Sequence, residues 1–253
     1  MDRSYLSQPE VIQASRRFVC IRLATYEDAE EGEILTSIFV GGSGQLENTT
    51  IAVLSSDGER FLARPGRGAR QMFVDAEDMA ATLQRIADET RAAAPAGAQD
   101  LPKIADVRLA LDIAACDGRP LVVLCATDAQ SRKSLEERVR DLAWSDAFAG
   151  LFVFASVSKS EDLAAIEGVP AQAGLLVIEP DRFGQKGRVT ASAPADAAPE
   201  ALALALREGL RAHVPLAKVH QSHVRAGRNA GIFWETKIPV TDPHEQHARS
   251  GAR

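Results

Sequence analysis

Short apolar runs alternate with helix-like patterns over residues 105–214, and this alternation constrains the fold more than any other feature of the chain. The runs are strand-sized and cover residues 121–126, 151–157 and 175–178, and a more polar strand is expected at residues 187–192 after a turn. Around them, apolar residues recur three or four positions apart, as they do on one face of a helix. Strands that alternate with helices favour a layered α/β fold, and the two late, adjacent strands favour a hairpin.

The order of these elements resembles the thioredoxin-like superfamily. A helix over residues 109–115, a tight turn at 117–120 and the strand at 121–126 match the start of that fold. A helix pattern over residues 128–144 and a last helix that opens at Pro199 follow in the same order. The resemblance implies a mixed sheet flanked by helices.

The thioredoxin dithiol is missing from this resemblance. Where it would place Cys-x-x-Cys, the chain has Ala129, Gln130, Ser131 and Arg132, and Ala173 stands at the position of the cis-proline. Thiol–disulfide exchange needs a thiolate that attacks and a second thiol that resolves the mixed disulfide. The resemblance therefore implies a redox-inactive member that keeps an exposed face for binding an extended peptide.

The N-terminal part shows a fainter version of the same scheme. Ser7 and Glu10 have the spacing of a helix capping box, and residues 18–23 have the composition of a strand. The later patterns predict a helix at 27–40, strands at 50–54 and 60–63, and a helix at 75–91. We expect a duplicated fold whose first copy, residues 1–94, is degenerate and lacks its first strand. The alternative is an unrelated α/β half.

Length and composition agree with two modest domains. The chain has 253 residues, of which 45% are hydrophobic and 25% charged. An Ala-, Gly- and Pro-rich break at 92–103 separates the first domain from the second, residues 104–215, which a tail at 216–253 follows. No run has the shape of a signal peptide or a membrane span, so we expect a cytoplasmic protein without membrane partners. The net charge of −6 argues against nucleic acid as a partner.

The sequence positions of the three cysteines indicate a structural role for their thiols, and we expect no cofactor. Cys20 and Cys125 lie inside apolar runs, where a free cysteine behaves as a small hydrophobic residue. Cys116 falls at the end of a predicted helix, beside Asp117. None of the three has the cation or helix N-terminus that a reactive thiolate needs.

All five histidines lie in the last part of the chain. His220 with His223, and His244 with His247, have the three-residue spacing that lets two imidazoles share a metal ion on a helix. Metal binding or delivery is therefore an alternative function. The other interpretation is that these are polar residues of a tail.

The tail also carries an isolated aromatic pair, Phe233 and Trp234. Such a pair must be buried on the chain itself or offered to a partner. We favour a non-catalytic protein that binds a protein partner or forms a homo-oligomer through the Ala129–Arg132 face, Ala173 and the tail. An enzyme with an unrecognised site, such as Ser131 with Lys133, is the remaining alternative.

Overall fold

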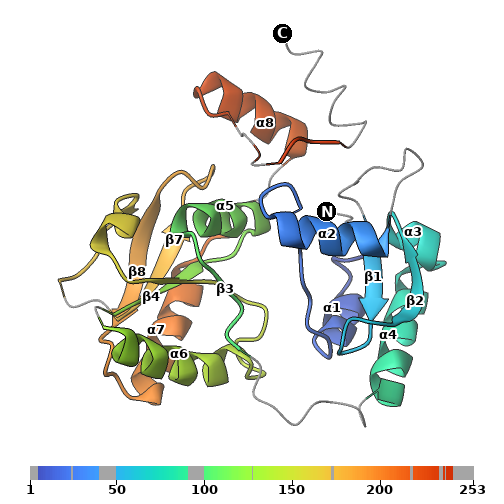
Figure 1. Cartoon of the computed structure of the whole chain (residues 1–253), viewed down its shortest axis with the longest axis horizontal. Coiled ribbons are helices and arrows are strands. Elements are labelled where there is room, and N and C mark those ends of the chain that lie inside the picture. Colours follow the sequence, from blue (N-terminus) through green and yellow to red (C-terminus); the bar gives the residue numbers. More distant parts are fainter. Residues whose placement is uncertain are drawn as a thin grey trace. The chain divides into compact units, whose positions relative to one another are not determined.

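The computed structural model describes residues 5–23, 25–39, 50–90, 100–126, 128–171, 174–216, 219–233, 236 and 238–241 (Figure 1). The chain divides into two compact units. The first comprises residues 1–97 and 234–253, and the second comprises residues 98–233. The second unit holds most of the regular structure and the candidate site.

The second unit is built on a six-stranded sheet. Its strands are β3 (Lys103–Ile104), β4 (Leu121–Cys125), β5 (Val153–Val157), β6 (Ile166–Glu167), β7 (Leu175–Pro180) and β8 (Gly187–Ala193). They lie in the order β3-β5-β4-β7-β8-β6. β3, β5 and β4 are mutually parallel, β7 is antiparallel to both β4 and β8, and β6 is parallel to β8. The expected mixed α/β sheet is thereby confirmed.

Helices cover both faces of this sheet. They are α5 (Val107–Asp117), α6 (Ala129–Ala143) and α7 (Pro199–Ala212), with a short 3-10 helix, η2 (Ser160–Leu163). A further helix, α8 (His220–Asn229), follows α7, and none of its described residues belongs to either apolar cluster of the sheet. α5 begins at an Asp106 cap, whose side chain accepts from the amides of Arg108 and Leu109, and it ends at Gly118 in the left-handed region, where glycine is favoured. Loss of that glycine would strain the turn into β4.

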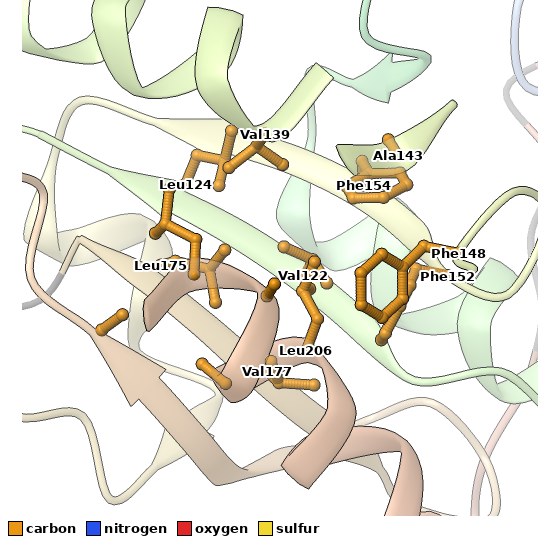
Figure 2. Close-up of a cluster of buried hydrophobic side chains, with 14 of the residues drawn as sticks. Val122, Leu124, Val139, Ala143, Phe148, Phe152, Phe154, Leu175, Val177 and Leu206 are labelled. Carbon is orange, nitrogen blue, oxygen red and sulfur yellow. The ribbon is translucent and has the colours of Figure 1, made fainter. Parts of the chain in front are cut away.

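Strand alternation gives the sheet two apolar faces. Val122 and Leu124 of β4 point to α6 and α7, whereas Leu121 and Val123 point to α5. Figure 2 shows the first face, where Val139 of α6 and Leu206 of α7 meet side chains of β4 and β7, and Phe148, Phe152 and Phe154 complete the cluster. A strand that is covered on both faces is expected to be almost continuously apolar. β4 is such a strand, because it is buried at every position.

The first unit is a smaller α/β assembly. Its elements are α1 (Pro9–Ser15), α2 (Ala29–Ile38), β1 (Ile51–Leu54), β2 (Phe61–Gly66), α3 (Ala69–Met72) and α4 (Ala76–Thr90). β1 and β2 form an antiparallel hairpin. Val53 of β1 packs in one cluster with Val11 of α1 and Leu83 and Ile86 of α4.

Two features of the first unit differ from the sequence-based expectation. Residues 18–23 belong to no strand, and Ile21 is 76% exposed. A strand needs a neighbour for its backbone hydrogen bonds as well as a suitable composition, so composition alone overestimates this segment. Residues 238–241 of the expected tail also group with this unit, and the Ile238 amide donates a 2.9 Å hydrogen bond to the Tyr26 carbonyl.

Candidate functional site

The candidate site is the first turn of α6, directly after β4. Asp128 caps the helix, and its carboxylate accepts a 2.8 Å hydrogen bond from the Ser131 amide. Hydrogen bonds from Ser131 lower the pKa of this carboxyl, so it is ionised at neutral pH. Ala129, Gln130 and Ser131 are exposed and Arg132 is half-buried. The predicted binding residues of this turn therefore form one accessible surface at the carboxyl end of β4.

The start of β7 lies beside the end of β4. The Cys125 amide donates a 2.7 Å hydrogen bond to the Gly174 carbonyl, and the Gly174 amide donates to Ala193 of β8. A Cβ atom at Gly174 would lie 2.1 Å from the Ala195 nitrogen, so only glycine fits there. Ala173, the predicted residue of this segment, lies outside the described residues.

The three thiols of the chain differ in exposure, since Cys20 and Cys116 are exposed and Cys125 is buried. All three cysteines carry thiols rather than disulfide bonds. Cys125 lies closest in sequence to the α6 turn, and burial raises the pKa of its thiol to about 12. It stays protonated at neutral pH, and a protonated thiol is neither a nucleophile nor a metal ligand.

The geometry of α6 also argues against Ser131 and Lys133 as a catalytic pair. Both residues lie in the same helix, two positions apart. Side chains with this spacing point to different sides of a helix and do not face each other. Activation of a hydroxyl requires a base within hydrogen-bond reach, which this spacing does not provide.

Glu136 anchors α6 to two strands, a feature that sequence reasoning missed. One carboxylate oxygen lies 2.5 Å from Nζ of Lys103 in β3, and the other accepts a 2.7 Å hydrogen bond from the Ser156 hydroxyl of β5. Burial raises the pKa of Glu136, but the hydrogen bonds from Lys103 and Ser156 and the nearby charge of Arg132 outweigh it, so the net pKa is lowered. The ionised carboxylate therefore holds the helix of the candidate site in place.

A charged hollow of about 260 Å³ adjoins this anchor. Three basic and three acidic side chains line it together with one leucine: Asp100, Leu101, Lys103, Lys133, Glu136, Glu137 and Arg140. Its side chains balance in charge, and Glu136 and Lys103 already pair with each other. We therefore interpret the hollow as part of the contacts by which Glu136 anchors α6 to the sheet.

The structure places two of the histidines in structural contacts. His213 follows α7, and its two ring nitrogens lie 2.6 Å from Glu179 Oε2 and 2.8 Å from the Gly118 carbonyl oxygen. The ring centroids of His223 in α8 and Phe183 lie 5.0 Å apart. His213 therefore joins the ends of α5 and α7 to β7, and His223 seats α8 on the β7–β8 turn.

The predicted metal ligands are only partly described. His220 and His223 both belong to α8, which is helical as their spacing requires, but only the backbone of His220 is described. His244 and His247 lie outside the described residues. Over the part of the chain that the structure describes, no three His, Cys, Asp or Glu side chains gather as a metal site. Metal binding remains a prediction.

The structure describes only one residue of the aromatic pair of the tail. Phe233 is 72% exposed, whereas Trp234 lies outside the described residues. Of the two uses expected for the pair, Phe233 has the exposure needed for contact with a partner.

Comparison with known proteins leaves the family open. No protein-family model matches the chain, and neither the curated proteins nor the solved structures contain a significant match. Among the described residues, none of the helices combines the length and the apolar character that crossing a membrane requires.

Proposed function

We propose that this chain is a non-catalytic, thioredoxin-like protein that acts as a protein-binding or self-assembling module. Its binding surface is the exposed first turn of α6, together with the adjoining start of β7. The proposal rests on a single observation. This turn is exposed and forms the capped N-terminus of α6 directly after a central strand, and it contains no cysteine.

The sheet of the second unit supports the thioredoxin-like part of the proposal. Five of its strands, β3-β5-β4-β7-β8, have the order and directions of a thioredoxin sheet, and β7 and β8 form its closing hairpin. α5 packs on one face, and α6 and α7 pack on the other, as that fold requires. In such a fold the turn after β4 is the place of the dithiol.

The first unit supports a duplicated origin. It contains an antiparallel hairpin, β1 and β2, followed by the short helix α3 and the long helix α4. The second unit has a similar order of elements, in which the hairpin of β7 and β8 is followed by α7. We also propose a cytoplasmic location, on the basis of the sequence composition alone.

A binding assay with a matched pair of variants tests the proposal. The wild-type chain should bind members of a library of extended peptides, measured by fluorescence anisotropy. Ala129→Arg places a large charged side chain on the exposed turn and should weaken binding at least about tenfold. Ala164→Arg makes the same change at an exposed position after η2 and should leave binding intact.

Two outcomes would overturn the proposal. One is a wild-type protein that binds no peptide or protein and stays monomeric at all concentrations. The other is wild-type affinity in both variants, which would place the binding surface away from α6.

A further inference from the structure

α8 has one face on its own unit and one face towards solvent. Gly227 is buried, and the His223 ring packs against Phe183, so these residues mark the inner face. Arg225 and Arg228 are exposed and three residues apart, which places both guanidinium groups on the outer face. α8 therefore presents positive charge to the solvent.

Exposed apolar side chains adjoin this helix in sequence. Val214, Leu216 and Val219 precede α8 and are 66%, 51% and 64% exposed, and Phe233 follows it. Residues 214–233 contain three cations, Lys218, Arg225 and Arg228, and no acidic residue. We call the outer face of α8 with Val214, Leu216, Val219 and Phe233 the α8 surface. Exposed apolar groups next to a single sign of charge are typical of an interaction site.

The same chain carries a surface of the opposite character on α2. Residues 25–39 contain five acidic residues and no cation. Glu30, Glu33 and Ile34 are exposed and share one face, whereas Gly32 and Leu35 are buried on the other. The helix dipole accounts for acids in the first turn, such as Glu30, but not for Glu33 or for an isoleucine that is 49% exposed.

We propose that the α8 surface of one copy docks on the acidic face of α2 of a second copy. Charge complementarity selects this occupant, because Arg225 and Arg228 match Glu30 and Glu33 at the same spacing, and Ile34 offers an apolar contact. In a two-fold dimer each copy contributes both surfaces, so the contact forms twice. The net charge of −6 disfavours nucleic acid or an anionic membrane as the occupant. The dimer proposal rests on the proposed function, because both assume that the chain acts through protein contacts. The dimer contact uses a surface other than the α6 turn.

Reciprocal charge reversal tests this pairing in the full-length chain. Size-exclusion chromatography with light scattering should give a dimer mass for the wild-type protein at low salt, and dissociation at high salt. Arg225→Glu/Arg228→Glu and Glu30→Arg/Glu33→Arg should each be monomeric, because like charges then face each other. An equimolar mixture of the two variants should recover the dimer, since both contacts of the mixed pair are again between opposite charges.

Arg16→Glu/Arg64→Glu is the matched control, because it makes the same chemical change at two other exposed arginines and should leave the dimer intact. Circular dichroism checks that each variant is folded. The proposal is overturned by a wild-type monomer at every concentration, by a dimer that survives both reversals, or by two monomeric variants that fail to pair. It is also overturned if a monomeric wild-type protein binds phosphatidylglycerol vesicles through Arg225 and Arg228. Peptide binding at the α6 turn is measured on the same samples, so its retention separates failure of the dimer from failure of the proposed function.

Discussion

Replacing Gly209 of α7 by alanine sets two opposing free energies against each other. A glycine inside a helix costs about 1 kcal/mol relative to alanine, so helix propensity alone predicts a gain in stability. A Cβ atom at Gly209, however, would lie 2.2 Å from Cγ1 and 2.7 Å from Cβ of Val177. Both distances are far inside van der Waals contact.

Val177 cannot yield easily, because it is fully buried in β7 at the centre of the sheet (Figure 2). Overpacking of a core costs about 1–3 kcal/mol, and a contact this short lies at the upper end of that range. We therefore expect Gly209→Ala to lower the free energy of unfolding by about 1–2 kcal/mol, after the gain in helix propensity is included.

Urea unfolding followed by circular dichroism measures this change. Glu208→Ala, at an exposed neighbour in the same helix, should stay within about 0.5 kcal/mol of the wild type. Val177→Ala in the Gly209→Ala background should recover about 1 kcal/mol relative to the sum of the single changes. Stabilisation by Gly209→Ala would refute the close approach of α7 to β7.

Three further predictions concern two anchors of the second unit and the C-terminal histidines. Glu136→Gln should cost about 1.5–3 kcal/mol at neutral pH, because it removes an ionised acceptor. Since the folded-state pKa of Glu136 lies below its ordinary value of 4.5, the stability difference from wild type should shrink as the pH falls below that value in urea titrations. Arg138 donates to the Ala195, Ala197 and Ser134 carbonyls, so Arg138→Met should cost about 1–3 kcal/mol by the same assay. If the C-terminal histidines bind metal, zinc should raise the melting temperature of tag-free protein, and an unchanged melting temperature in calorimetry would remove the metal-binding alternative.

Apolar periodicity predicts most of the second unit. β4, β5 and β7 are apolar enough to be recognised without any knowledge of their neighbours, and the inward residues of α6 and α7 recur at helical spacing. β8 is more polar, and only part of it is buried. β3 and β6 have two residues each, which is too short for a periodic signal. They exist because β5 and β8 offer them backbone partners.

Other parts of the fold depend on tertiary contacts that local sequence does not encode. α8 contains Gly227 and few apolar residues, and its position depends on the contact between His223 and Phe183. The role of Glu136 depends on partners 33 and 20 residues away. The first turn of α6 was predictable, because the Asp128 cap directly follows a buried strand.

We propose that the first turn of α6 occupies the place of a thioredoxin dithiol and carries none of its chemistry. Reduction of insulin disulfides by the wild-type chain and by Ala129→Cys/Arg132→Cys, compared in one assay, tests it most directly. A thiol at the N-terminus of a helix has a lowered pKa, so the double variant should form a disulfide within the turn and reduce insulin, whereas the wild type should not. Insulin reduction by the wild-type chain, or a double variant whose two thiols never form a disulfide, would contradict the account.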